Sequence, residues 1–170
     1  MELKRSIFSL REWQTDDVRS LQEQANNKNI SGYLFDSFPF PYTTDDARKF
    51  ISRHQNQNPL TTFAIIVDNN VAGGIEFKPG NDIYSKRAFL GYWLGQAFWG
   101  RGIMTEAVKL ITAYAFENFD FIRIQATVNG NNPSSMRVLE KAGFKKEGVM
   151  KNAIVKHGQV MDEHLYALLK

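Results

Sequence analysis

The sequence of 170 residues contains no cysteine and only three histidines, His54, His157 and His164. Without cysteine, disulfide bridges, thiolate metal sites and a cysteine nucleophile are all excluded. The histidines are not spaced as a pair of metal ligands, and no HExxH pattern is present. We therefore expect no resident metal.

Long hydrophobic runs are also missing. No apolar stretch approaches the roughly 18 residues that a membrane-spanning helix needs. The first residues, 1–5, lead into mixed polar sequence and not into the apolar core of a signal peptide. We expect a protein that does not enter a membrane and that is cytoplasmic.

Positive charge is present in excess but is not concentrated. The formal net charge is +3, and the strongest basic cluster consists of Lys141, Lys145, Lys146, Lys151 and Lys156. A nucleic-acid-binding protein usually carries a denser basic stripe, so direct binding of nucleic acid is disfavoured. A mild positive excess suits a small polyanionic ligand.

The order of hydrophobic patterns predicts one mixed sheet with helices on both faces. Residues 33–42 contain prolines, which exclude a regular helix, and several aromatic residues. The segment is predicted to be either an ordered loop or the wall of a pocket. Gly73 and Gly74 indicate a bulge or a close backbone approach. We expect residues 1–170 to form a single α/β (α+β) domain of about seven strands and about four helices. The predicted strands cover residues 7–13, 61–67, 71–77, 87–94, 121–128, 149–155 and 160–168, and the predicted helices follow residues 15–17, 43–46, 102 and 134 or 135.

Residues 91–107 are the stretch around which the chain is organised. An apolar, aromatic strand leads into a loop with Gly95, Gly100 and Gly102, and apolar residues then recur at helical spacing. The start of a helix offers backbone N–H groups without partners and a partial positive charge, and glycine lets an anion approach the backbone. Arg101 adds a formal charge. The stretch favours a phosphate site, although a helix that merely follows a glycine-rich turn is the alternative.

Two nucleotide-binding motifs do not fit this loop. A dinucleotide fingerprint needs a third glycine three residues after Gly102, where the chain has Thr105. A P-loop needs Gly-Lys-Ser/Thr, which is absent. The ligand is therefore expected to be phosphorylated but to bind by another motif.

The chain resembles the GNAT superfamily of N-acetyltransferases, and within it the branch typified by ribosomal-protein N-terminal acetyltransferases. The resemblance rests on residues 91–94 with 99–107 and, independently, on residues 132–135 with 138–144; residues 10–11, 38–42 and 147–148 also look like that branch. It covers nearly the whole chain and implies a splayed sheet, acetyl-CoA as donor, an amine as acceptor and no metal.

The resemblance also implies where acetyl-CoA lies. The pyrophosphate is expected on the loop from Trp99 to Thr105, and the pantetheine beside the strand end. The family pattern Gln/Arg-x-x-Gly-x-Gly/Ala is met at Gly102, whereas Trp99 and Met104 depart from it. The implied cofactor-binding residues are Trp93, Leu94, Trp99, Gly100, Arg101, Gly102, Ile103, Met104, Thr105, Asn132 and Ser135.

Three catalytic roles follow from direct attack of an amine on the thioester. A backbone N–H at Leu94 could stabilise the oxyanion, and Ser135 could assist the departing thiolate, although Ser135 could equally cap a helix. Glu76 is our candidate for the base that accepts the amine proton. The alternative is that Glu76 is only a solvent-facing residue of its strand. Other relatives carry a glutamate where this chain has Phe89. Glu106 stands in the first turns of the helix after residue 102, where a role in the helix dipole or in packing is expected. Tyr33, Tyr84 and Tyr92 are weaker alternatives for the acid or for positioning the acceptor.

The acceptor is left open between a protein N-terminus, such as that of a ribosomal protein, and a small amine. A catalytically silent acyl-CoA-binding module is the alternative function, and a homodimer is an open alternative for the assembly.

Overall fold

The computed structural model describes residues 2–170, which form eight strands, five α-helices and three short 3₁₀ helices. The strands form one open mixed sheet in the order β1-β2-β3-β4-β5-β6-β8-β7. This confirms the mixed α/β class and adds one strand and one helix to the predicted numbers. None of the helices in this range is long and apolar enough to cross a membrane.

The strands are β1 (Glu2–Lys4), β2 (Ser9–Arg11), β3 (Thr62–Val67), β4 (Asn70–Pro79), β5 (Arg87–Leu94), β6 (Arg123–Asn129), β7 (Lys145–Lys156) and β8 (Gln159–Leu169). The α-helices are α1 (Val18–Ala25), α2 (Lys28–Ser31), α3 (Thr44–His54), α4 (Ile103–Asn118) and α5 (Pro133–Lys141), and the 3₁₀ helices are η1 (Thr15–Asp17), η2 (Asp82–Tyr84) and η3 (Gln96–Phe98).

The chain divides into two compact units. Unit 1 holds residues 2–76 and 92–103, and unit 2 holds residues 77–91 and 104–170. The division falls inside β4 and β5, so each of these strands contributes to both units. That residues 1–170 act as one domain stays a prediction.

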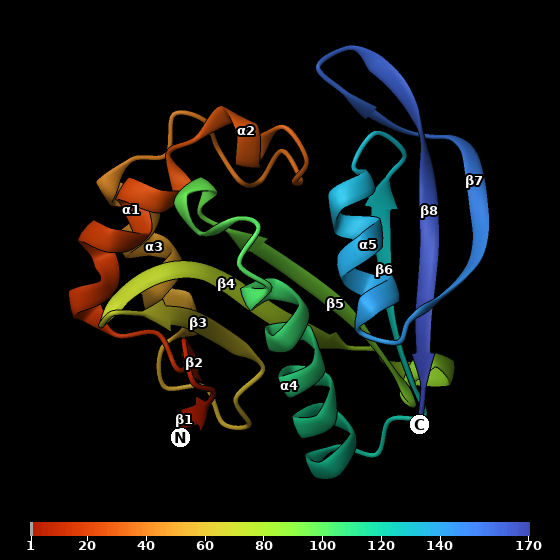
Figure 1. The fold of residues 1–170 in the computed structure, drawn as a ribbon, viewed down its shortest axis with the longest axis horizontal. Coiled ribbons are helices and arrows are strands. Elements are labelled where there is room, and N and C mark those ends of the chain that lie inside the picture. Colours follow the sequence, from red (N-terminus) through yellow and green to blue (C-terminus); the bar gives the residue numbers. More distant parts are fainter. Residues whose placement is uncertain (1) are drawn as a thin grey trace. The chain divides into compact units, whose positions relative to one another are not determined.

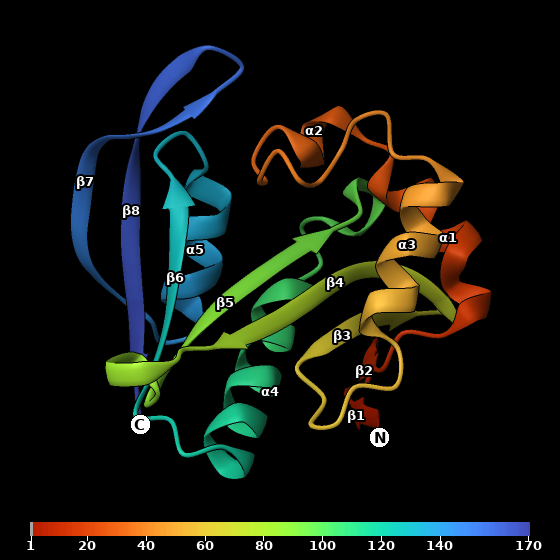
Figure 2. The same ribbon diagram turned by 180° about the vertical axis from the view of Figure 1, so that it is seen from behind.

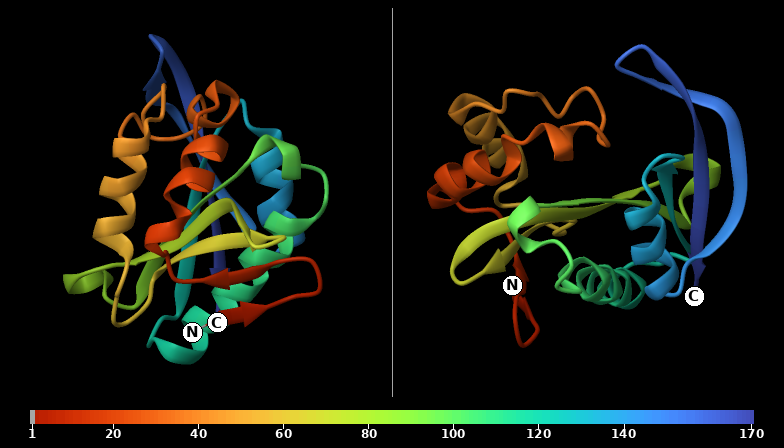
Figure 3. Two further views of the ribbon diagram at one scale, coloured as in Figure 1. Left: turned by 90° about the vertical axis from the view of Figure 1, so that its left-hand side faces the viewer. Right: turned by 45° about the horizontal axis from the view of Figure 1, so that its top comes forward.

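Unit 1 is built on the antiparallel strands β1 to β4, with α1 and α3 side by side (Figures 2 and 3). The predicted helix after residues 43–46 is confirmed as α3. Its capping box is formed by the Thr43 hydroxyl, which accepts from the Asp46 N–H, and by the Asp46 carboxylate, which accepts from the Thr43 N–H. Sequence patterns missed β1 and α2, which have only three and four residues.

The core of unit 1 lies between these two helices and the strands β3 and β4. Amphipathic spacing places Leu21 and Ala25 of α1 and Ala47 and Ile51 of α3 on inward faces, all fully or almost fully buried. The remaining members of the cluster are Trp13, Tyr42, Ala64, Ile66 and Val71. This packing holds β3 and β4 in place under the helices.

The predicted hairpin at residues 61–78 is confirmed as β3 and β4. Its turn uses Asp68 and Asn69 at φ values of 48° and 63°, the left-handed conformations that a two-residue hairpin turn needs. The register shifts between Ile65 and Ile66, beside Gly73, so the predicted bulge is present.

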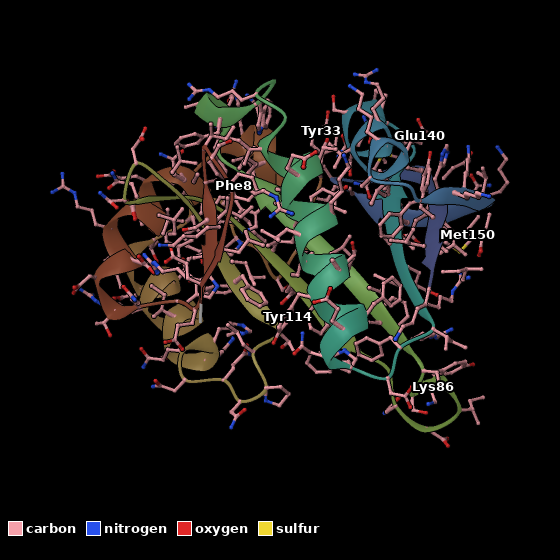
Figure 4. The ribbon with its side chains drawn as sticks, turned by 60° about the horizontal axis from the view of Figure 1, so that its bottom comes forward. Phe8, Tyr33, Lys86, Tyr114, Glu140 and Met150 are labelled. Atoms are coloured by element: carbon pink, nitrogen blue, oxygen red, sulfur yellow. The ribbon has the colours of Figure 1, made fainter. Side chains whose placement is uncertain are left out.

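Unit 2 contains the parallel pairing of β5 with β6 and the antiparallel order β6-β8-β7, with α5 beside β6 (Figure 1). The register of β5 against β6 covers the first three residues of β5, and β5 itself continues to Leu94. α5 ends as predicted, because Gly143 at φ 95° lets the Phe144 N–H bond to the Leu139 carbonyl. On α5, Glu140 (Figure 4) accepts a hydrogen bond from the Tyr166 hydroxyl of β8 at 3.0 Å.

An aromatic cluster anchors α4 in unit 2. Phe77 of β4 lies 6.1 Å from the ring of Tyr114 on α4 (Figure 4), 5.0 Å from Phe119 and 6.0 Å from Phe121, measured between ring centroids. Edge-to-face aromatic pairs contribute about 0.5–1.5 kcal/mol each beyond their burial. They hold the far end of α4, the helix whose first turn follows the glycine-bearing loop.

Candidate active site

The predicted strand, loop and helix at residues 91–107 are all present. β5 ends at Leu94, η3 follows, and α4 begins at Ile103. Between η3 and α4, Gly100 and Gly102 have φ values of +76° and +75°, which only glycine adopts without strain. The two glycines therefore set the path by which the chain enters α4.

Side-chain and backbone hydrogen bonds hold this loop. The Trp99 Nε1–H donates to the Leu94 carbonyl at 2.7 Å, and the Gly95 N–H donates to the Ala72 carbonyl at 2.7 Å. The Gln96 side-chain oxygen accepts from the amide groups of Asn27, at 2.8 Å, and Asn29, at 3.1 Å. Sequence reasoning expected Trp99 to contact the cofactor, and the structure gives its indole the further task of joining the loop to the strand end.

The surroundings of the loop fit an anion bound by backbone groups. A Cβ atom added to Gly100 or Gly102 would meet no atom within 4 Å, so the space beside both glycines is open. Ile103 and Met104, the first two residues of α4, are buried. Arg101 is exposed, with its guanidinium carbon 5.5 Å from the centroid of the Phe98 ring. Acetyl-CoA, if held here, has helix-start N–H groups and one cation for its pyrophosphate.

The end of β5 lies unusually close to β4. A Cβ atom on Gly73 would stand 2.4 Å from the Trp93 carbonyl oxygen and 3.0 Å from the Leu94 Cα. A Cβ atom on Gly74 would stand 2.8 Å from the Trp93 Nε1. The predicted close approach at the glycine pair is thus confirmed, and any side chain at either position would push β5 or the Trp93 indole away.

Aromatic side chains line this part of unit 1. The Trp93 ring lies 5.6 Å from Phe38, which lies 5.0 Å from Tyr42. Burial raises the pKa of Tyr42 to about 12, and the charge of Asp46 acts in the same direction, so the Tyr42 hydroxyl stays protonated at neutral pH. In the 33–42 loop Tyr42 is buried, whereas Phe35 and Phe40 are exposed. The loop is thus anchored at one end and presents apolar rings to solvent.

Glu76 lies on the same face of β4 as Gly74, since alternate residues of a strand share a face. Its side chain is exposed, and one carboxylate oxygen accepts from the Thr62 hydroxyl at 3.5 Å. Thr62 is also its partner in the β3–β4 register. The predicted base is therefore accessible to a ligand and is held by one weak contact.

His54 belongs to a network beside Glu76. The Gln57 side-chain oxygen accepts from the N–H groups of Thr61 and Thr62, so its amide nitrogen is the donor to His54 Nδ1, 3.3 Å away. This assigns the proton of the neutral imidazole to Nε2. Burial lowers the pKa of His54, the charge of Glu76 raises it, and that of Arg53 lowers it further.

This lowered pKa predicts an acid-dependent loss of stability. Because the folded pKa lies below the unfolded value of about 6.5, the contribution of neutral His54 is complete above that pH and declines as pH falls toward the folded pKa. The His54→Gln variant, which does not titrate, should lose less thermal stability than the wild type between about pH 7 and pH 5. Melting curves that shift in parallel for both proteins would contradict this assignment.

Asn132 and Ser135 lie at the start of α5 in unit 2. Asn132 is the N-cap, because its side-chain oxygen accepts from the Ser135 N–H at 3.2 Å, and Pro133 takes the first helical position. The prediction that Ser134 or Ser135 caps this helix was wrong, since asparagine beside proline supplies the cap. Ser135 is instead the third helical residue, and its hydroxyl is not needed as the cap.

The other candidate groups have local partners. Glu106 accepts a hydrogen bond from Lys109 at 2.8 Å on the surface of α4. In unit 2, the guanidinium carbon of Arg87 lies 3.7 Å from the centroid of the Tyr84 ring and 5.0 Å from that of the Phe89 ring. Across residues 2–170, no cluster of three or more histidine and acidic side chains could hold a metal ion.

Comparison with known proteins places these features in a family. The Acetyltransferase (GNAT) domain family matches residues 8–145. A probable N-acetyltransferase of Bacillus subtilis, YjcK, is 34% identical over 91% of this chain and 89% of its own length. A putative ribosomal N-acetyltransferase of the same species, YdaF, is 31% identical over 62% of this chain and 57% of its own length.

Solved structures agree on the fold. The ribosomal alpha-N-protein acetyltransferase RimL, in complex with coenzyme A, superposes with a TM-score of 0.88 at 24% identity, over 99% of this chain and 98% of that one. The mixed sheet and the strand–loop–helix at residues 91–107 are thus those of the GNAT fold. The chain belongs to the GNAT family of acetyltransferases and is an acetyl-CoA-dependent N-acetyltransferase.

Proposed function

We propose that this enzyme transfers the acetyl group of acetyl-CoA directly to the α-amino group of a peptide or protein, and that the loop before α4 holds the donor. The observation that carries the proposal is the pair of glycines at positive φ, with open space beside both, between β5 and α4. Because residues 99–105 would act through their backbone, the departures at Trp99 and Met104 leave the site intact.

Each further donor-binding residue has a role suited to its position. The backbone of Trp93 and Leu94, at the end of β5, is proposed to pair with the pantetheine as a neighbouring strand would. The Asn132 oxygen is engaged in the helix cap, so its amide N–H₂ is the group proposed to bind pantetheine. Acetyl-CoA supplies the activated acetyl thioester.

Charge that develops during the transfer is stabilised by two donors in this proposal. The Leu94 backbone N–H is proposed to bind the acetyl oxygen as it becomes negative. The Ser135 hydroxyl is proposed to donate to the sulfur as it leaves. Glu76 accepts the proton of the attacking amine, and no residue of the enzyme becomes acylated, which agrees with a chain that has no cysteine.

An α-amino group is favoured as acceptor because it needs the least activation. Its pKa is about 7.7–8.0, whereas that of a lysine-type amine is about 10.4, so far more of it is neutral at physiological pH. The exposed rings of Phe35 and Phe40 offer apolar surface that a peptide can cover. YdaF and RimL, which carry ribosomal substrates in their names, add support by analogy.

The test is a kinetic panel with acetyl-CoA and three acceptor classes. These are peptides with a free N-terminus, the same peptides with a blocked N-terminus and one lysine, and small polyamines. We expect the highest kcat/KM for the free N-terminus. A preference for polyamines would show that the acceptor is a small amine and not a peptide. Binding of acetyl-CoA without any turnover would indicate a catalytically silent binding module.

Ser135→Ala should lower kcat while leaving acetyl-CoA affinity nearly unchanged, because the thiolate exists only once the bond begins to break. Since Asn132 caps α5, the melting temperature should also stay close to that of the wild type. Ser134→Ala, one residue earlier and exposed, is the matched control and should keep full kcat. If both variants turn over at the wild-type rate, Ser135 has no part in the leaving-group step.

A further inference from the structure

We propose that Thr62 is a positioning residue, whose hydroxyl holds one oxygen of the Glu76 carboxylate and so presents the other oxygen to the attacking amine. This role rests on the proposed function, in which Glu76 accepts the amine proton.

Thr62 and Glu76 lie directly opposite each other on β3 and β4. Side chains at such positions share a face of the sheet, with Cβ atoms about 4.5–5.5 Å apart. Thr62 is only 5% exposed, whereas Glu76 is exposed. The Thr62 hydroxyl donates to Glu76 Oε2 at 3.5 Å, and within residues 2–170 this is its one hydrogen bond. A buried hydroxyl is costly without an acceptor, so Thr62 is directed at the carboxylate.

The backbone of Thr62 is itself fixed to the core of unit 1. Its N–H donates at 3.1 Å to the side-chain oxygen of Gln57, whose amide nitrogen lies 3.3 Å from His54 Nδ1. The His54 ring packs on Phe50 at 4.5 Å between centroids, and Phe50 meets the buried ring of Trp13 edge-on at 5.1 Å. The donor is therefore held by packed groups, which a positioning residue requires.

Glu76 lies close to the strand end at which the acetyl group is proposed to bind. Gly74 precedes it by two residues on the same face, a separation of about 6.6 Å along β4. A Cβ atom on Gly74 would stand 2.8 Å from the Trp93 Nε1, and one on Gly73 would stand 3.0 Å from the Leu94 Cα. All five residues belong to unit 1, so the path from Thr62 to the end of β5 stays within one compact unit.

The length of the contact suits a free enzyme. An O–H···O bond is usually about 2.5–3.0 Å long, and catalytic hydrogen bonds are often long before the substrate binds and then tighten. A glutamate side chain on a strand surface has several rotamers. Binding of one oxygen by Thr62 selects among them and leaves the second oxygen free to take a proton.

The experiment begins with Thr62→Val, which keeps the shape of the side chain and removes the hydroxyl. Because a hydrogen bond to a charged group is worth tenfold or more, kcat at pH 7.5 should fall roughly tenfold, with acetyl-CoA affinity unchanged. The loss should shrink as pH rises and the amine becomes neutral without help. Above pH 7 His54 stays neutral, because burial lowers its pKa, so its titration does not enter the comparison.

Thr62→Ser restores the hydroxyl and should recover most of kcat. Thr112→Val removes another buried hydroxyl, one that donates to a carbonyl of its own helix at 2.8 Å, and should keep the wild-type kcat. Equal kcat in Thr62→Val and the wild type, or an equal loss in Thr62→Ser and Thr62→Val, would overturn the positioning role.

A double-mutant cycle shows whether Thr62 acts through Glu76. In the Glu76→Gln background no base remains to be positioned, so Thr62→Val should cause little further loss. The same tenfold loss in both backgrounds, or wild-type turnover in Glu76→Gln, would overturn the positioning of a base by Thr62.

The contact can also be measured without turnover. In protein labelled with ¹³C at the glutamate carboxyl groups, the Glu76 signal, identified by its absence in Glu76→Gln, should move in Thr62→Val and stay near its place in Thr62→Ser. An unmoved signal in Thr62→Val would show that Thr62 does not hold the carboxylate. Absence of acetyl transfer to every amine would instead overturn the proposed function, and with it the catalytic purpose of the contact.

Discussion

Replacing Glu76 with glutamine is expected to lower turnover by roughly 10²- to 10⁴-fold, the usual contribution of general-base assistance, while acetyl-CoA still binds. The amide keeps the shape and can still accept from the Thr62 hydroxyl, but it cannot take a proton at neutral pH. The exposed position of Glu76 on the face of β4 that carries Gly74 makes it accessible to an acceptor.

The pH dependence distinguishes this role from a structural one. Below the pKa of the acceptor amine most acceptor is protonated, so the loss in Glu76→Gln should be largest there and should shrink as pH rises. Glu117→Gln, which changes an exposed carboxylate near the other end of α4, should follow the wild-type profile. A Glu76→Gln profile that overlays the wild type would remove Glu76 from the mechanism and leave a water molecule or a tyrosine as the acceptor of the proton.

Gly102→Val is expected to abolish most of the binding of acetyl-CoA. The branched side chain would fill the open space beside the loop and block the approach of a pyrophosphate to the backbone. For the wild type, acetyl-CoA at 100 times its Kd should add about 2.7 kcal/mol to the free energy of unfolding, equivalent to a rise in Tm of roughly 5–10 °C for a chain of this size. The variant should show little of this rise.

The chain supplies a matched control for the strain in this variant. Gly158, in the turn between β7 and β8, has φ +76° against +75° for Gly102, and an added Cβ would also meet nothing within 4 Å. A side chain at such a φ costs about 1–3 kcal/mol, so both valine variants should melt earlier without ligand. Only Gly102→Val should lose the ligand-induced rise. An equal rise in both variants would show that the loop before α4 is not the donor site.

Local signals explain what could be predicted from the sequence. The capping box of α3, the turn at Asp68 and Asn69, and the strand–glycine–helix change at residues 91–107 each depend on residues close together in the chain. Such signals act through backbone conformation and hydrogen bonds within a few residues. They were sufficient for β5, for α3 and α4 and for the hairpin of β3 and β4.

Features that depend on distant or competing partners could not be predicted. β1 is a strand of three residues that exists through its pairing with β2. Asn132, and not Ser134 or Ser135 as expected, is the N-cap of α5, because Pro133 fits the first helical position. The bond from Trp99 to Leu94 and the contact of the Arg87 guanidinium with the Tyr84 ring depend on side-chain directions that spacing alone does not define. The roles of Glu76, Leu94 and Ser135 remain predictions.

The most direct measurement of the central claim is a titration of the isotope-labelled protein with coenzyme A, followed by the shifts of its backbone amide signals. If the backbone before α4 holds the donor, the largest saturable shifts should belong to the N–H groups of residues 100–105, with smaller ones at Leu94 and Asn132. The turn at His157 and Gly158 should stay unchanged. Saturable shifts that leave residues 100–105 unaffected and concentrate elsewhere in the chain would contradict the account.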